Sequence, residues 1–195
     1  ITPSHLIDEV KTKENFDKVN DAIGDILDVY LDRKPCFSEF QADISWWLGQ
    51  LLGMEQIMYY MYDRPEWLHK VLAFFRDGIL KVHSEATKNG DWKTLSSANQ
   101  CVPLAKELPE PANVKAEMSD LWGFFASQEY ALISPQMHDE FLLQYQLPIM
   151  KQYGLIAYGC CEDLTRKIDM LRQVPNLRRI AVSPFADVGK CAEQI

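Results

Sequence analysis

No apolar run in the sequence is long enough to cross a membrane. The longest apolar stretches, around Trp46–Met61 and Val71–Phe75, are interrupted by polar residues every few positions. Neither reaches the roughly 20 residues that a bilayer requires. The chain also does not open with a basic segment followed by an apolar core, which is the pattern of a secretion signal. We therefore expect a cytoplasmic protein without a membrane partner.

Clusters of lysine and arginine are absent as well. The net charge is −8, and basic residues are not interleaved with aromatic ones, so nucleic acid is not expected as a partner. The five cysteines lack the spacing of a disulfide framework, and two of them, Cys160 and Cys161, are sequence neighbours. Reduced thiols are therefore a better interpretation than structural disulfides.

The residues that are present indicate a globular protein with several helices. Apolar residues make up 47% of the 195 positions and charged residues 25%, which is enough for one sizeable core. Helical spacing is weak over Ile7–Asp21 and strong over Ile44–Met61, with a possible break at Gly53. A further helix is expected to begin at Asp63–Glu66, where a capping acid precedes proline, and to end near Asn89-Gly90.

Strands are expected in five segments of the chain. They are Ile26–Leu31, Thr94–Cys101, Trp122–Ile133, Leu155–Cys161 and Leu177–Ser183. Helices should follow the last three and begin at Ser134-Pro135, Asp163 and Asp187, because serine and aspartate cap helices well. Pro148 should kink or restart the first of these helices, and Val102–Val114, with its prolines, should be a surface loop.

The spacing of these segments predicts an α/β fold with parallel strands. The last two predicted strands start only 22 residues apart, and strand–helix–strand units of this kind form parallel pairs with right-handed crossovers. Five strands are too few for a closed barrel of eight. We expect residues 1–195 to be a single domain, an internal portion of a partial (β/α)8 TIM barrel. An opened barrel exposes strand edges, so self-association is also expected.

The segment Leu155–Leu164 is the strongest candidate for a functional site. A predicted strand ends there in two cysteines and two acids, at the end of the strand where α/β proteins place their chemistry. Cys160 could be a metal ligand, a site thiol or a packed core residue, and alternation places Cys161 on the opposite face. Glu162, expected on the Cys160 face, could ligate a metal, act as acid or base, or only stabilise a helix N-terminus.

Several other polar residues are candidates for contacts with a substrate. Glu129 lies in an apolar segment and needs a partner or a pocket, since an unpaired buried carboxylate is costly. Gln128 and Asn99 lie at polar ends of predicted strands. Tyr158 could bind a substrate or a metal-bound water, or be a packed aromatic, and Asp187 is a helix cap that could also face the pocket.

The histidines are not expected to form a metal site. All four lie on predicted helices or on the terminal tail, where surface or packing roles are expected: His5, His69, His83 and His138. Because none is at a predicted strand end, the sequence does not favour a histidine-rich zinc site within this chain.

Seven segments, which span most of residues 45–195, carry a likeness to a known group of proteins. They are Leu51–Glu55, Tyr62–Trp67, Trp122–Glu129, Ile133–Phe141, Pro148-Ile149, Tyr158–Glu162 and Ser183–Asp187. In these segments the chain resembles the uroporphyrinogen decarboxylase superfamily, which includes corrinoid-dependent methyltransferases. The resemblance implies a (β/α)8 barrel with its pocket at the carboxyl ends of the strands.

The resemblance also implies an activity and roles for the candidate residues. It implies an enzyme that moves a methyl group between a small methylated compound and a corrinoid protein, although the isolated chain should be inactive. Members that activate a thiol carry His-x-Cys at the end of the matching strand. Here the cysteine falls on Cys160 and the histidine on Tyr158, and two-residue spacing predicts that both face the same way. Zinc is the candidate metal, with Cys160 as its ligand.

In this scheme Glu162 and Glu129 are the candidate catalytic residues. Tyr158, Gln128, Asn99 and Asp187 are the candidate substrate contacts. One alternative is a metal-independent decarboxylase of a polycarboxylate or tetrapyrrole, which would need basic residues at the pocket. Arg178 and Arg179 are expected at the wrong end of their strand for that purpose. Another alternative is a non-catalytic module that binds a corrinoid or tetrapyrrole.

Overall fold

The computed structural model describes residues 2–35, 44–97 and 105–195, and shows a mixed α/β fold with a small sheet. Its helices are α1 (Glu9–Ile23), α2 (Ile44–Leu52), α3 (Met54–Asp63), α4 (Pro65–Asn89), α5 (Pro135–His138), α6 (Gln144–Met150), α7 (Ile168–Leu171) and α8 (Val188–Glu193). Its strands are β1 (Trp122–Phe125), β2 (Leu155–Tyr158) and β3 (Leu177–Ile180). Three short 3₁₀ turns are η1 (Thr94–Ser97), η2 (Met118–Asp120) and η3 (Gln128–Tyr130), and a π turn is η4 (Asp139–Leu143).

The sheet is parallel, as the spacing of the segments predicts. Its strand order is β1-β2-β3. Phe125 pairs with Tyr158, and Tyr158 pairs with Ile180, with a shift of register between Ile156 and Ala157. Because all three strands run the same way, their carboxyl ends meet at one edge of the sheet.

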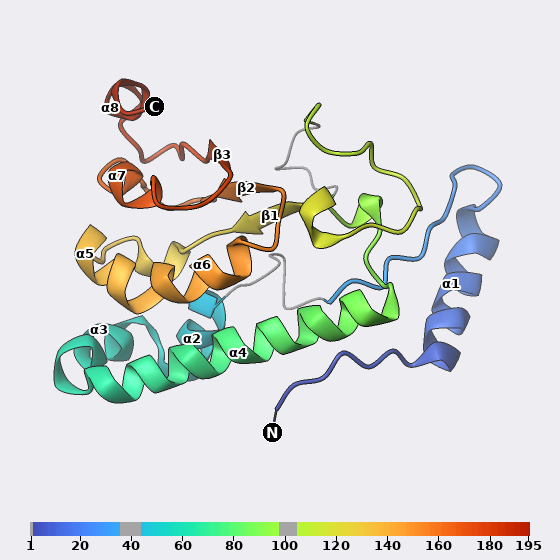
Figure 1. Ribbon diagram of the computed structural model, residues 1–195, viewed down its shortest axis with the longest axis horizontal. Coiled ribbons are helices and arrows are strands. Elements are labelled where there is room, and N and C mark those ends of the chain that lie inside the picture. The colour runs from blue at the N-terminus through green and yellow to red at the C-terminus, as the bar shows by residue number, and fades with distance from the viewer. Residues whose placement is uncertain (1, 36–43, 98–104) are drawn as a thin grey trace.

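Helices cover one face of this sheet. Phe125, Ile156 and Tyr158 contribute to the main core, together with apolar residues of α2, α3, α4, α6 and α7. Figure 1 shows α6 next to the sheet and the long α4 beyond it. The other face carries a much smaller cluster around Trp122 and Phe124, against which residues of the 105–108 loop pack. We call this second side the open face of the sheet.

The long helical region is divided as the sequence predicts. Helix α2 ends before Gly53, whose φ of 79° and ψ of 150° interrupt the helical path before α3 begins. Helix α4 ends at Gly90 in the left-handed conformation. Asp63 does not cap α4, however: the capping position is Arg64, which makes no side-chain capping bond.

Two predicted strands are wrong. Ile26–Leu31 follows α1 as irregular chain, and Ile26 and Leu27 are largely exposed. Thr94–Ser97 is the 3₁₀ turn η1, and the rest of that prediction, to Cys101, lies outside the described residues. A short apolar run becomes a strand only where another strand pairs with it.

The segments that follow β1 and β2 also begin differently from the prediction. The strand predicted over Trp122–Ile133 ends at Phe125, and η3 follows. The helix expected at Asp163 begins only at Ile168, because the Asp163 carboxylate accepts hydrogen bonds from the amide and hydroxyl of Thr165 and so stabilises a turn.

Other local predictions are confirmed. Ser134 caps α5 by accepting a hydrogen bond from the Met137 amide, and Asp187 caps α8 by accepting one from the Lys190 amide.

The chain continues from α5 through the π turn into α6, which contains Pro148. The prediction that the helix restarts at Pro148 is wrong, because the π turn lies before this residue and α6 runs through it. Residues 105–114 form a loop without regular helix or strand.

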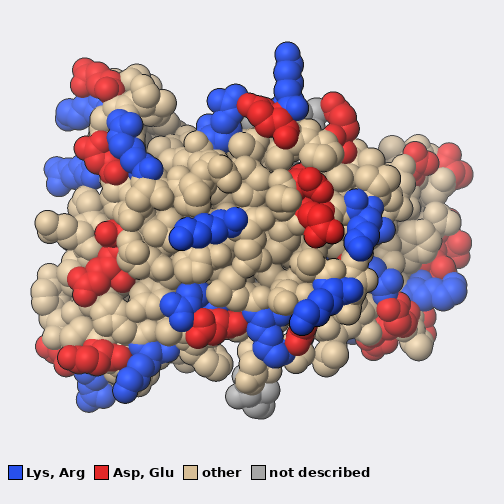
Figure 2. Space-filling view, in the orientation of Figure 1, with Lys and Arg blue, Asp and Glu red and all other residues tan. Residues whose placement is uncertain are grey.

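The outside of the molecule has a mixed charge. On the face shown in Figure 2, basic and acidic side chains are interspersed, and neither sign forms a continuous patch. Within the described ranges, every helix is too short or too polar to pass through a bilayer.

Candidate functional site

The ends of β1 and β2 are joined by one buried carboxylate, that of Glu162. Its Oε1 atom accepts hydrogen bonds from the Ser127 amide at 2.8 Å and the Ser127 hydroxyl at 3.1 Å. Its Oε2 atom accepts one from the Cys160 amide at 2.9 Å. The two bonds from Ser127 connect the residues that follow β1 with those that follow β2, and the bond from Cys160 lies within the second of these segments. We call this arrangement the Glu162 bridge.

Gly159 allows the chain to turn back toward this bridge. Its φ is 98°, a value that other residues rarely adopt, and an added Cβ would lie 2.6 Å from Leu164 Cδ1. After this turn, Glu162 reaches back to the amide of Cys160. The expected strand over Leu155–Cys161 therefore ends at Tyr158, and the alternation of a strand does not continue into the two cysteines.

The turn places Tyr158 and Cys160 on different sides of the sheet, so the prediction of a shared face is wrong. Tyr158 belongs to the helix-covered core, while Cys160 packs against the cluster on the open face. The Tyr158 hydroxyl donates to Gln146 Oε1 at 3.0 Å and lies 2.9 Å from Nε2 of His138. It is bound by helix residues and is not presented to a ligand beside Cys160.

His138 is a polar group of this region that the sequence analysis missed. It is fully buried, and burial, with a smaller contribution from the Lys167 ammonium, holds its pKa well below the usual range. Because Tyr158 donates to Gln146, neutral His138 donates from Nε2 to the tyrosine oxygen. Its other ring nitrogen has no hydrogen-bond partner among the described residues. No sequence pattern predicts this contact, because it depends on how α5 packs against β2.

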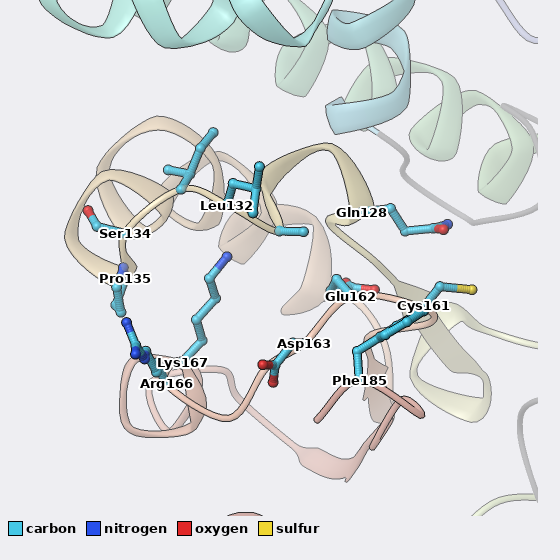
Figure 3. A pocket seen from close by; sticks show the side chains of 12 residues that line it. Gln128, Leu132, Ser134, Pro135, Cys161, Glu162, Asp163, Arg166, Lys167 and Phe185 are labelled. Atoms are coloured by element: carbon cyan, nitrogen blue, oxygen red, sulfur yellow. The ribbon is translucent and has the colours of Figure 1, made fainter. Parts of the chain in front are cut away.

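A cavity of about 710 Å³ lies between the loops that follow β1 and β2. We call it the helix-side cavity; Figure 3 shows its lining side chains. It is lined by Gln128, Ala131, Leu132, Ile133, Ser134, Pro135, Cys161, Glu162, Asp163, Arg166, Lys167 and Phe185. It therefore brings together two of the predicted site residues, Gln128 and Glu162.

Lys167 contributes a buried amine to the helix-side cavity. The residue is only 3% exposed, and its side chain points into the cavity in Figure 3. The Nζ atom donates to the Tyr130 carbonyl at 2.6 Å. Burial lowers the pKa of Lys167 to about 8, against the opposing effect of the Glu162 and Asp163 carboxylates. The sequence pattern missed this residue because it follows a predicted helix start.

A second hollow, of about 410 Å³, lies on the open face at the ends of β2 and β3. We call it the open-face hollow. Its lining includes Cys160, Arg179 and Ser183 beside an apolar floor that contains Phe124 and Ala157. Tyr158 also borders it, although its hydroxyl is bound on the other side. Arg179 pairs with Ala157 across the sheet, which brings it to the same hollow as Cys160. The prediction that Arg179 lies at the wrong end of its strand is therefore wrong.

The remaining predicted site residues are elsewhere. Glu129 Oε2 accepts a hydrogen bond from the hydroxyl of Ser45 in α2 at 2.6 Å. Of the two expected alternatives, a partner or a pocket, Glu129 therefore has a partner, and it lines neither hollow. Asp187 is exposed and pairs with Lys190 at 2.9 Å, and it also lines neither hollow. Asn99 lies outside the described residues.

The described residues do not form a zinc site of the expected kind. Over residues 2–35, 44–97 and 105–195, no group of three histidine, cysteine or acidic side chains is placed to hold a metal ion. Tyr158 is turned away from Cys160, and both carboxylate oxygens of Glu162 accept amide hydrogen bonds. Cys160 and Cys161 lie with their sulfur atoms 3.5 Å apart, but a structural zinc ion takes four ligands.

No family model, curated protein or solved structure matches this chain.

Proposed function

We propose that this chain is part of a (β/α)8 barrel enzyme similar to uroporphyrinogen decarboxylases, with its substrate at the carboxyl edge of the sheet. The sheet supports this proposal because it is parallel and has helices packed against one face. Parallel sheets are normally covered on both faces. In a (β/α)8 barrel the helices lie outside, so the open face corresponds to the interior of the barrel.

The reaction that we propose is transfer of a methyl group between a small methylated compound and a corrinoid protein. The observation that carries it is the open-face hollow, where the thiol of Cys160 lies beside apolar residues and Arg179. An apolar floor suits a methylated compound, and a guanidinium group suits an anionic group on the same molecule. The proposal contains no metal step, since the described residues do not supply a fitting set of ligands.

Metal-independent decarboxylation is the second candidate, and Arg179 is the observation that favours it. A polycarboxylate needs cations around the reacting group, and Arg179, which was expected at the opposite end of its strand, lines the hollow. Arg178 instead lies 3.4 Å from Glu107 in an exposed ion pair. Because Arg179 is the only basic residue among the described lining residues, we rank decarboxylation below methyl transfer.

Titration with methylcobalamin tests the leading proposal. Binding would be measured by calorimetry on the unmodified protein and on Arg179→Gln, Cys160→Ser and Arg178→Gln. We expect the first two substitutions to weaken binding about tenfold, as loss of one charge-assisted or packed contact does. Arg178→Gln, the control outside the hollow, should leave binding unchanged.

An absorbance measurement on the same proteins separates the alternatives. Loss of the cobalt–methyl absorbance on addition of a thiol acceptor supports methyl transfer, whereas binding without turnover supports a corrinoid-binding module. If methylcobalamin does not bind, or if all four proteins bind it equally, the proposal is wrong. Release of carbon dioxide from a polycarboxylated tetrapyrrole, dependent on Arg179, would then favour the decarboxylase.

A further inference from the structure

We propose that Cys160 and Cys161 are a redox modification site, at which the two neighbouring thiols form a reversible disulfide. The two sulfur atoms lie 3.5 Å apart. Bond formation requires them to approach to about 2.05 Å, a shift that two side-chain rotations and a small change of the backbone can provide. This inference is independent of the proposed function, because it concerns only the chemistry of the two thiols.

The position of the pair in the fold permits such a change. The cysteines follow the last residue of β2 and precede α7, in a turn without regular secondary structure. Hydrogen bonds of the sheet would resist rotation of the peptide between the two cysteines, but these bonds end at the preceding residues. The Gly159 amide donates to the Phe125 carbonyl, and the Ala181 amide donates to the Tyr158 carbonyl.

The pair is also accessible to a small oxidant. Cys161 is exposed and lies at the edge of the helix-side cavity, where Figure 3 shows its sulfur atom at the end of an extended side chain. Cys160 is partly buried beside it. Cys191, by contrast, is buried, with its sulfur 3.6 Å from the Thr165 hydroxyl. Reaction should therefore begin at Cys161 and spare Cys191.

The oxidant that we propose is a low-molecular-weight disulfide such as oxidised glutathione. The Cys161 thiolate attacks one sulfur of this disulfide and expels a thiolate, which leaves a mixed disulfide on Cys161. The Cys160 thiolate then attacks the Cys161 sulfur and expels the second thiolate. Two protein thiols are oxidised, one small disulfide is reduced to two thiols, and the protons of the cysteines pass to the two leaving groups.

The disulfide should be easy to reduce, and its formation should weaken a hydrogen bond to the residue that follows β1. Adjacent Cα atoms are about 3.8 Å apart, closer than the usual range of about 4.4–6.8 Å for a disulfide, so the bond is strained and labile. Ring closure also moves Cys160, whose amide donates to Glu162 in the Glu162 bridge. Oxidation should therefore loosen the hydrogen bond from the Ser127 amide to the same carboxylate.

Mass spectrometry of one tryptic peptide tests the proposal. The protein would be equilibrated with mixtures of oxidised and reduced glutathione, treated with N-ethylmaleimide and digested. Cleavage after Lys151 and Arg166 releases a peptide that contains Cys160 and Cys161 and no other cysteine. We expect this peptide without maleimide and lighter by two hydrogen atoms, whereas the Cys160→Ser variant should retain glutathione on Cys161.

Three controls make the outcome decisive. The same protein unfolded in urea should form the ring more slowly, because the fold holds the two sulfur atoms 3.5 Å apart. Reduced thiol should reverse the reaction, and the exchange rate of the Ser127 amide should rise in the oxidised protein. The proposal is overturned if both cysteines of the folded protein are alkylated at every ratio, if the unmodified protein retains glutathione as the variant does, or if folding makes no difference.

Discussion

At the scale of single residues, the polar side chains at the carboxyl edge of the sheet are of two kinds. Some hold the structure together, and others point into a cavity. Glu162 resembles a catalytic acid in the sequence, but its two oxygens accept three hydrogen bonds from Ser127 and Cys160. Lys167, which the sequence pattern did not single out, points into the helix-side cavity. The role of each of these two side chains therefore follows from its burial and its contacts, and could not be read from its residue type.

Replacement of Glu162 by alanine should destabilise the protein by about 2–6 kcal/mol. The substitution leaves the amides of Ser127 and Cys160 without an acceptor, and each unsatisfied buried donor costs about 1–3 kcal/mol. Urea unfolding of the variant measures this loss. Glu107→Ala is the matched control, because Glu107 is exposed and forms a surface ion pair with Arg178; it should change stability little. Equal effects of the two substitutions would contradict the Glu162 bridge.

The buried amine of Lys167 predicts a stability that increases with pH. Its pKa is about 8 in the folded protein and near 10.4 when unfolded, so between these values the unfolded state binds more protons. Stability therefore rises as pH passes above 8. Relative to Lys167→Met, the unmodified protein should gain on the order of 2 kcal/mol between pH 7 and about pH 9.5. Urea unfolding at both pH values checks this. Parallel changes in the two proteins would show that Lys167 titrates normally.

At the scale of secondary-structure elements, local signals were reliable where the cause was local. Ser134 and Asp187 cap their helices, and Gly53 divides α2 from α3, because these effects involve only neighbouring residues. The apolar run Ile26–Leu31 failed as a strand, since no strand lies beside it among the described residues. Asp163 is an acid before a helix, but its bonds to Thr165 delay the start of α7.

A substitution of Gly53 tests the break between α2 and α3. Its φ and ψ lie in a region that is accessible almost only to glycine, and no atom lies within 4 Å of an added Cβ. Gly53→Ala should therefore cost about 1–3 kcal/mol through backbone strain alone. Gly189→Ala, inside α8 with its nearest atom at 3.5 Å, should be neutral or slightly stabilising. Thermal unfolding compares them, and a neutral Gly53→Ala would show that this glycine is not needed.

At the scale of the whole molecule, the main feature is a parallel sheet with helices on one face and a small cluster on the other. β1 and β3 are its edge strands, and the open face carries the open-face hollow. Of the predicted fold, the structure shows the α/β class and the parallel direction of the strands.

Two edge strands predict self-association. The sedimentation coefficient should increase with protein concentration, as the unpaired edges of different molecules pair with one another. Val182→Lys places a charge at the rim of the open-face hollow, where Val182 is 41% exposed, and should reduce association. Val114→Lys, at a 54% exposed position in the 105–114 loop, is the control. A compact monomer at every concentration would contradict the partial barrel.

The sequence by itself determined the caps of α5 and α8, the break at Gly53 and the parallel direction of the strands. These features depend on neighbouring residues or on spacing along the chain. Only the tertiary structure decided that Tyr158 and Cys160 lie on different faces, that Arg179 joins Cys160 at one hollow, and that Glu162 bridges two strands. Each of those facts depends on a turn at Gly159 or on contacts between residues distant in the chain, which no local pattern contains.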